Sequence, residues 1–199
     1  MGFLISVKLG HSLDPIIIKL YRFFLKNHNI NPNVFTALGL IFAYISCLFI
    51  AMGHNIIAGF ALLISGIFDL LDGAMARVSN RVTSFGGFFD SVLDRYSDLF
   101  VLYGIVIFFI KRSELIYCLI TIIAIIGVAI IPYVKARAEA ASIKCNTGIL
   151  ERPERIIILL IGLFFNLLSF AIMVIAVLSH ITVIQRIVFV WKESNKNKI

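Results

Sequence analysis

Long apolar segments are the feature that most constrains this chain. Six follow one another, at residues 34–53, 55–76, 86–110, 115–134, 153–168 and 170–191. A helix that crosses the hydrocarbon core of a membrane needs about 20 apolar residues. Apolar residues make up 60% of the sequence and charged residues only 15%, which excludes a disordered chain and an ordinary water-soluble enzyme. We therefore predict an all-α integral membrane protein with one domain over residues 1–199, in which residues 34–191 form a bundle of six transmembrane helices.

The last two apolar segments are separated only by a short polar break at residues 166–169. A single straight helix over residues 156–191 would overrun a hydrocarbon core of about 30 Å at about 1.5 Å per residue. The length therefore predicts two helices here instead of one.

An amphipathic segment precedes the first apolar one. Asp14 and Pro15 are typical of a helix start, with a capping residue followed by proline at the first helical position. Beyond them, basic residues share one helical face, and aliphatic and aromatic residues share the other. We predict a helix over residues 12–29 that lies in the membrane interface.

Basic residues are distributed unevenly between the two ends of the predicted bundle. The 18 Lys and Arg residues exceed the 11 Asp and Glu residues, which gives a net charge of +7. Such an excess can indicate nucleic-acid binding in a soluble protein, whereas in a membrane protein basic loops mark the cytoplasmic side. Lys111 and Arg112 alone lie in a loop opposite the termini. We predict a protein of the cell (inner) membrane with cytoplasmic termini, a cytoplasmic active site and no nucleic-acid partner.

Carboxylates occur in or beside the second and third apolar segments, where a charge is costly and normally marks function. They are Asp69, Asp72, Asp90, Asp94 and Asp98. Asp69 and Asp72 are three residues apart, and Asp90 and Asp94 four, so each pair shares a helix face. The two helices would be antiparallel and joined by a short loop. Both pairs are therefore expected to meet at the same membrane edge.

Converging carboxylates repel one another in a low dielectric unless they are protonated or neutralised. Protons, sodium ions, or Arg77 and Arg95 as internal counterions are alternatives. Divalent cations fit better, because oxygen ligands suit Mg²⁺ and Mn²⁺ and paired ions serve phosphoryl transfer. An ion-coupled transporter is the rival from another class, although the sequence shows no convincing internal repeat. The fifth carboxylate, Asp98, either supports the site or pairs with Arg95.

The spacing of these residues resembles the signature of the CDP-alcohol phosphatidyltransferases, membrane enzymes that build phospholipid head-group linkages. The chain reads Asp69-x-x-Asp72-Gly73-x-x-Ala76-Arg77, then eight residues, then Gly86-x-x-x-Asp90-x-x-x-Asp94. An earlier stretch, Pro32-Asn33-x-x-Thr36, resembles another motif of the family. The resemblance implies transfer of a phosphatidyl or related group from a CDP-linked donor to an alcohol, with release of CMP. It also implies two Mg²⁺ or Mn²⁺ ions and a homodimer.

The same resemblance implies a role for each signature residue. Asp69 and Asp90 would contact both ions. Asp72 would contact the first ion and Asp94 the second, and Asp94 would also be the general base for the acceptor hydroxyl. The residues expected to bind the CDP part of the donor are Pro32, Asn33, Gly73, Arg77 and Thr83.

Basic segments near the fourth and fifth apolar segments bear on the acceptor alcohol. Residues 133–139 and 148–155, with Arg186, resemble parts of the phosphatidylinositol phosphate and archaetidylinositol phosphate synthases. Lys135, Arg155 and Arg186 would then bind a phosphate of the acceptor, because the arginine fork suits phosphate oxygens. We predict transfer from CDP-diacylglycerol or CDP-archaeol to a phosphorylated polyol, with inositol phosphate favoured. Phosphatidylglycerophosphate synthesis, and di-inositol-phosphate synthesis from CDP-inositol, are the alternatives.

Overall fold

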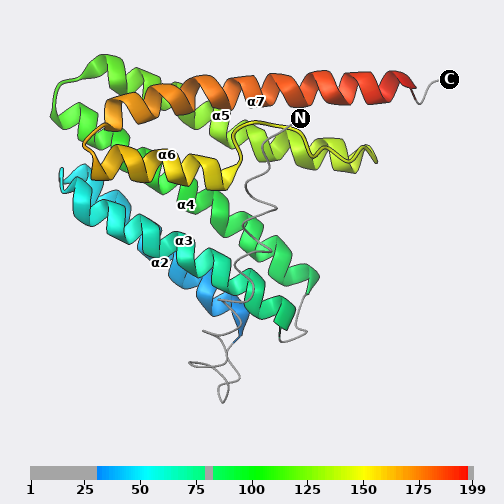
Figure 1. The fold of residues 1–199 in the computed structure, drawn as a ribbon, viewed down its shortest axis with the longest axis horizontal. Helices are drawn as coiled ribbons and strands as arrows, with labels where there is room; N and C mark the ends of the chain where they lie inside the picture. The colour runs from blue at the N-terminus through cyan, green and yellow to red at the C-terminus, as the bar shows by residue number, and fades with distance from the viewer. Residues whose placement is uncertain (1–30, 79–82, 197–199) are drawn as a thin grey trace. The chain divides into compact units, whose positions relative to one another are not determined.

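A computed structural model describes residues 31–78 and 83–196, and Figure 1 shows that they form a series of helices. These are α2 (Pro32–Ala51), α3 (Asn55–Val78), α4 (Ser84–Lys111), α5 (Leu115–Ala140), α6 (Arg152–Phe164) and α7 (Leu168–Lys196). The prediction of an all-α chain is confirmed, and each predicted apolar segment corresponds to one helix. The interfacial helix predicted over residues 12–29 lies outside the described residues.

The described helices include four that are long and apolar enough to cross a membrane. They are α2, residues Asn55–Gly73 of α3, α5 and α7. Helix α6 has only 13 residues, which at about 1.5 Å per residue is shorter than a core of about 30 Å. Helix α4 is long enough with 28 residues, but its first half carries several charges. The chain is a multi-pass membrane protein, and the number of six spans stays a prediction.

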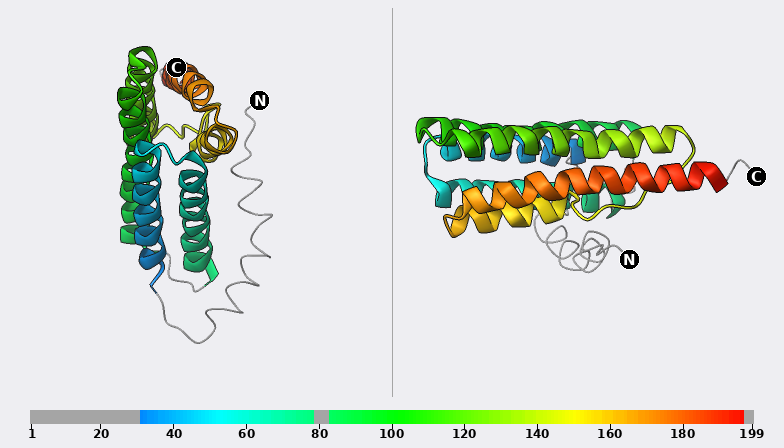
Figure 2. Two further views of the ribbon diagram at one scale, coloured as in Figure 1. Left: turned by 90° about the vertical axis from the view of Figure 1, so that its left-hand side faces the viewer. Right: turned by 90° about the horizontal axis from the view of Figure 1, so that it is seen from above.

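The break between the last two helices lies close to the predicted position. Helix α6 ends at Phe164, and Asn166 adopts the left-handed conformation with a φ of 57°. The Leu167 N–H donates to the Gly162 carbonyl oxygen at 2.8 Å, a bond that typically closes such a turn. A Cβ on Gly162 would lie 2.6 Å from the Cβ of Ala171. The turn therefore lets α6 and α7 pack closely, and they run side by side in Figures 1 and 2.

The chain divides within α4 into two compact units. The first unit ends at Gly104, and the second begins at Ile105. In the first unit, α2 and α3 are neighbours that run in opposite directions (Figure 2). In the second unit, α7 packs along both α5 and α6. The extent of the single domain over residues 1–199 stays a prediction.

Small residues line the face of α2 that is buried in the first unit. The buried residues of this helix are Thr36, Gly39, Ala43, Ser46, Cys47, Ile50 and Ala51. The Ser65 hydroxyl of α3 donates to the Gly39 carbonyl oxygen at 2.8 Å, which ties the two helices together. On α4, a Cβ on Gly104 would lie 2.6 Å from the Cys47 carbonyl oxygen. Small side chains thus let α3 and α4 both approach α2 closely.

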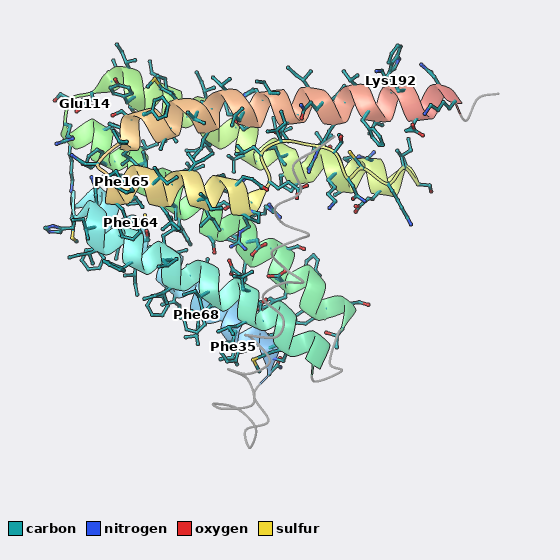
Figure 3. The ribbon with its side chains drawn as sticks, viewed as in Figure 1. Phe35, Phe68, Glu114, Phe164, Phe165 and Lys192 are labelled. Atoms are coloured by element: carbon teal, nitrogen blue, oxygen red, sulfur yellow. The ribbon has the colours of Figure 1, made fainter. Side chains whose placement is uncertain are left out.

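Aromatic rings of α2 and α3 pack against each other. The ring centroids of Phe35 and Phe68 lie 6.0 Å apart, and those of Phe42 and Phe68 lie 5.5 Å apart. Figure 3 labels Phe35 and Phe68 where the two helices run together. Aromatic pairs at these separations contribute to packing beyond the area that they bury, so these rings hold the α2 and α3 pair that carries part of the candidate site.

Candidate active site

Capping residues set the starts of α2 and α4. Asn31 caps α2, since its side chain accepts a hydrogen bond from the Asn33 N–H at 3.1 Å, and Pro32 stands in the first turn. Thr83 stands directly before α4, and its hydroxyl oxygen accepts from the Gly86 N–H at 2.9 Å. Both residue types are favoured at this position because they satisfy a backbone N–H that the helix leaves unpaired. Local capping therefore positions three of the predicted donor-site residues, Pro32, Asn33 and Thr83.

The starts of these two helices meet at Gly86. A Cβ on this glycine would lie 3.0 Å from Thr83 Oγ1 and 3.5 Å from Asn33 Oδ1. Asn33 and Thr83 are far apart in the sequence, yet their polar atoms surround the same glycine. The absence of a side chain at Gly86 leaves room beside them, so the structure brings together these two residues that the sequence predicts for the donor site.

Two carboxylates of α3 face α2. The side chain of Asp72 is almost fully buried, with 6% of its surface exposed, and its carboxylate accepts a hydrogen bond from the Thr36 hydroxyl. One turn earlier, Asp69 Oδ1 lies 2.9 Å from the point that a Cβ on Gly39 would occupy. Helix α2 thus supplies a donor for one carboxylate and open space for the other.

Asp90 and Asp94 stand one turn apart in the first half of α4, and both are partly exposed. The carboxylates of Asp69 and Asp90 lie close enough to Asp72 to act on it electrostatically. Helices α3 and α4 therefore bring three of the four predicted metal ligands into one region of the first unit, and Asp94 follows Asp90 along the same helix face.

This set of oxygen donors fits a hard divalent cation. Asp72 Oδ2 is buried and has no hydrogen-bond partner among the described residues, which is costly for a carboxylate unless a cation or proton satisfies it. Carboxylate oxygens are also the ligands that Mg²⁺ and Mn²⁺ prefer. Within residues 31–78 and 83–196, no three His, Cys, Asp or Glu side chains are yet arranged as a metal site. The chemistry of the oxygen donors is therefore what favours a divalent cation at this place.

Three other residues singled out in the sequence also lie in the first unit. Gly73 and Arg77 stand near the end of α3, and the side chain of Arg77 lies outside the part that the structure describes. On α4, Asp98 Oδ2 lies 3.9 Å from Nη1 of Arg95. The pairing between Asp98 and Arg95 that the sequence offered as one alternative is therefore present.

The predicted acceptor-phosphate residues stand on three helices of the second unit. Lys135 belongs to α5, Arg155 to α6 and Arg186 to α7. Lys135 is partly exposed, whereas Arg155 and Arg186 are each only 2% exposed. A buried guanidinium is costly unless its N–H groups are hydrogen-bonded and its charge is paired, so the partners of these arginines decide how they are held.

The partners of Arg186 come from three parts of the second unit. Its Nε donates to the Thr147 carbonyl oxygen at 2.8 Å, and its Nη1 donates to the Ile131 carbonyl oxygen at 2.7 Å. Its Nη2 faces Glu151 Oε1 at 3.4 Å. One side chain of α7 thus connects α5, the segment between α5 and α6, and the residue directly before α6.

Gly148 lets the segment between α5 and α6 lie against α7. Its φ of 142° is rarely adopted by residues with a side chain, and a Cβ there would lie 2.7 Å from Cγ2 of Thr182. The Thr182 hydroxyl oxygen accepts from the Leu150 N–H at 3.0 Å. Because Thr182 and Arg186 are one turn apart, α7 holds this segment at two successive positions of one face.

Glu151 joins two of the predicted acceptor residues. It caps the N-terminus of α6, where Glu154 Oε2 accepts from the Glu151 N–H at 3.2 Å. The Arg155 N–H donates to the Glu151 carbonyl oxygen at 3.2 Å. The backbone of Glu151 therefore begins the helical turn that carries Arg155, while its side chain faces Arg186.

Sequence reasoning assigned no role to Thr36, Gly39, Glu151 or Thr182. Helical spacing contains a partial signal, because Thr36 and Gly39 are three residues apart and Thr182 and Arg186 are four apart. Such spacing places two residues on one face, but it does not tell which side chain of another helix that face meets. For Glu151 the only signal was its place within a basic segment.

Comparisons with known proteins identify the family of the chain and several relatives. The chain matches the CDP-alcohol phosphatidyltransferase family over residues 29–187. It is 38% identical over 159 residues to the archaetidylinositol phosphate synthase of Pyrococcus horikoshii. This alignment covers 79% of this chain and 82% of that protein. These matches extend over both compact units.

Solved structures are similar as well. The crystal structure of Mycobacterium tuberculosis phosphatidylinositol phosphate synthase with CDP-DAG bound aligns with a TM-score of 0.77 at 33% identity, covering 89% of this chain and 92% of that one. A crystal structure of the same synthase in complex with manganese and citrate also has a TM-score of 0.77 at 33% identity, covering 89% of this chain and 88% of that one. The similarity therefore extends to nearly the whole fold.

Proposed function

Since the chain belongs to the CDP-alcohol phosphatidyltransferase family and is therefore a transferase, we propose that it transfers a phosphatidyl-type group from a CDP-linked lipid to inositol phosphate and releases CMP. The observation that carries the proposal is the group of Asp69, Asp72 and Asp90 on neighbouring helices. The bound CDP-DAG of the mycobacterial synthase supports a CDP-linked lipid donor. The two relatives synthesise archaetidylinositol phosphate and phosphatidylinositol phosphate, which supports an inositol phosphate acceptor.

Two divalent ions, Mg²⁺ or Mn²⁺, are proposed to bind Asp69, Asp72, Asp90 and Asp94. Bound ions neutralise the pyrophosphate of the donor and stabilise the charge that develops on the CMP leaving group. The Thr36 hydroxyl orients Asp72, and the space at Gly39 allows Asp69 to adopt the conformation that a ligand needs. The manganese complex of the mycobacterial synthase supports a divalent metal.

Asp94 is proposed as the general base. It takes the proton of the acceptor hydroxyl, which then attacks the phosphorus on the lipid side of the pyrophosphate. A bond forms between this phosphorus and the acceptor oxygen, and the bond to the bridging oxygen breaks. CMP leaves with the electron pair, and Asp94 later releases the proton to water.

The donor is proposed to bind through its CDP part at the helix starts of the first unit. The residues of this subsite are Pro32, Asn33, Gly73, Arg77 and Thr83. Its support is the meeting of Asn33 and Thr83 beside Gly86, where a glycine lets a ligand approach the backbone. The positive charge of Arg77 suits the donor phosphates.

The acceptor phosphate is proposed to bind Lys135, Arg155 and Arg186. The excess of basic residues at one end of the helices supports a cell (inner) membrane location with cytoplasmic termini and a cytoplasmic active site. Membrane lipids surround the protein, which is proposed to act as a homodimer without a nucleic-acid partner.

The test is CMP release by purified protein in detergent. CDP-diacylglycerol and CDP-archaeol are compared as donors, each with Mg²⁺ or Mn²⁺, and the acceptors are inositol phosphate, glycerol phosphate, inositol and serine. The proposal expects the highest kcat/KM with inositol phosphate. Preference for glycerol phosphate would instead identify phosphatidylglycerophosphate synthesis, and turnover only with CDP-inositol would identify di-inositol-phosphate synthesis.

The transporter alternative has its own outcome. If no acceptor released CMP from the wild type while the Asp94→Asn variant kept cation-dependent transport in vesicles, the proposed transfer reaction would be wrong.

A further inference from the structure

Arg186 has two kinds of partner. The carbonyl oxygens of Thr147 and Ile131 accept from Nε and Nη1 at 2.8 and 2.7 Å. They belong to the backbone and are held by the fold. The third partner is a side chain, Glu151, whose Oε1 lies 3.4 Å from Nη2. This contact is the longest of the three. The Glu151 side chain also belongs to the capping box of α6, in which it accepts from the Glu154 N–H, so a carboxylate that leaves Nη2 keeps a donor at the helix start.

We propose that Glu151 is a place-holding carboxylate, which pairs with Arg186 while no acceptor is bound and is replaced by the acceptor phosphate. The inference rests on the proposed function, because Arg186 is there assigned to that phosphate. The two carbonyl bonds keep the plane of the guanidinium in place while its anion changes. Arg186 therefore meets the phosphate in a preorganised orientation, with its fork still able to donate charge-assisted hydrogen bonds.

Burial explains why a place-holder is useful. Only 3% of the Arg186 side chain is exposed, against 24% of the Glu151 side chain. A buried guanidinium without an anion is strongly destabilising, so exchange of a carboxylate for a phosphate keeps the charge paired throughout. Glu151 has access to solvent and can turn away, whereas Arg186 cannot.

The position of Glu151 directly before α6 keeps the free-energy cost of the exchange low. Glu151 directly precedes α6, and the unpaired N–H groups and dipole at a helix N-terminus favour a negative charge. A displaced carboxylate therefore stays in a favourable field. The same short movement takes place beside the helical turn that carries Arg155, the second arginine assigned to the phosphate.

Place-holding also affects acceptor choice. An incoming group must compete with a carboxylate for Nη2, which a phosphate does well and a neutral polyol does poorly. Glu151 thus acts against unphosphorylated acceptors, a form of specificity that works by excluding competitors. Its cost is a weaker apparent affinity for the correct acceptor.

The decisive variant is Glu151→Gln, with Glu154→Gln as the matched control. Both change a carboxylate of the capping box at the N-terminus of α6, but the Glu154 carboxylate accepts from the Glu151 N–H and the Glu151 carboxylate faces Arg186. The measurements are KM and kcat for inositol phosphate at saturating CDP-lipid. For Glu151→Gln we expect KM to fall about fivefold, the size of one partly exposed ion pair, with kcat within about twofold of the wild type. Glu154→Gln should leave KM unchanged.

An unchanged or raised KM in Glu151→Gln, or an equal fall in Glu154→Gln, would overturn the exchange and leave Glu151 a purely structural cap. If Glu151→Gln does not fold, Glu151→Asp replaces it. The shorter side chain keeps the cap and the charge but withdraws the carboxylate from Nη2, so KM should still fall and kcat should be retained. A wild-type KM in this variant would equally contradict the proposal.

Calorimetry of inorganic phosphate binding separates this inference from the proposed function. Tighter phosphate binding by Glu151→Gln than by the wild type supports the exchange even if CMP release reveals another alcohol as acceptor. Equal phosphate binding, together with wild-type turnover of inositol phosphate, would overturn the exchange alone.

Discussion

Asp72 and Arg186 are both almost fully buried, yet the chain satisfies them in different ways. Asp72 accepts a hydrogen bond from Thr36, but its charged neighbours include the carboxylates of Asp69 and Asp90, and its Oδ2 has no hydrogen-bond partner among the described residues. Arg186 has two backbone carbonyls and an opposite charge as partners. A group of like charges favours a cation or a proton from outside, whereas any ligand of a paired charge has to compete with the internal partner.

The change Asp72→Asn tests the group of like charges around Asp72, and it should have the largest effect on CMP release. Amides are weaker ligands than carboxylates, so CMP release should fall by about two orders of magnitude or more. Loss of a buried negative charge among like charges should leave the melting temperature unchanged or raised. Rates and thermal melts with and without Mn²⁺ measure both. A large loss of stability would mean that the Asp72 charge is already compensated within the protein.

The change Arg186→Ala tests the other side of the comparison, the paired charge of Arg186. It leaves two carbonyl oxygens and the Glu151 carboxylate without their donor, so stability should fall by about 3–5 kcal/mol. Arg186→Lys should recover only part of this loss, because an ammonium cannot reproduce the planar fork. Chemical denaturation in detergent provides the measurement. If Arg186→Ala were as stable as the wild type, the network around Arg186 would not hold the segment between α5 and α6.

The change Gly39→Ala sharpens the comparison without altering any charge. A Cβ here would lie 2.9 Å from Asp69 Oδ1, and the carboxylate would have to move. We expect CMP release to fall about tenfold at low Mn²⁺ and to recover at high Mn²⁺, since ligand geometry is disturbed while the ligand is kept. Gly87→Ala is the matched control, because no atom lies within 4 Å of its Cβ position. Similar losses in both variants would argue for a general effect of alanine on helix packing.

The change Thr36→Val should have the smallest effect of the four. It keeps the shape of the side chain and removes the hydroxyl that donates to Asp72. A hydrogen bond to a charged group contributes about 1.5–3 kcal/mol to stability, and Mn²⁺ can take over part of this stabilisation. We expect the metal concentration for half-maximal activity to change a few fold with little change in kcat. A wild-type metal dependence would show that Thr36 does not orient Asp72.

Hydropathy and spacing predicted the helices well. The positions of all six helices from α2 to α7 correspond to predicted apolar segments, and the division of residues 156–191 into two helices is confirmed. These features depend on local chain length and composition. Helix α6 is shorter than the predicted 153–168 segment because the turn at Asn166 begins earlier.

The partners of the site residues were harder to predict. The spacing of Asp69 and Asp72 placed them on one face of a helix, but only the packing of α2 against α3 showed that Thr36 and Gly39 meet them. The basic segments near the fourth and fifth apolar segments, with Arg186, predict a phosphate site. That Arg186 already holds a carboxylate from Glu151 depends on a contact between residues 35 positions apart.

The sequence by itself determined that this chain crosses a membrane and which segments are helical, and it predicted which carboxylates and arginines bear on the chemistry. Solvent exposure and helical periodicity act over a few residues, so one sequence contains this information. The tertiary structure alone decided which charges are compensated. Compensation depends on distances of a few ångströms between residues far apart in the chain, and only packing of the helices sets those distances.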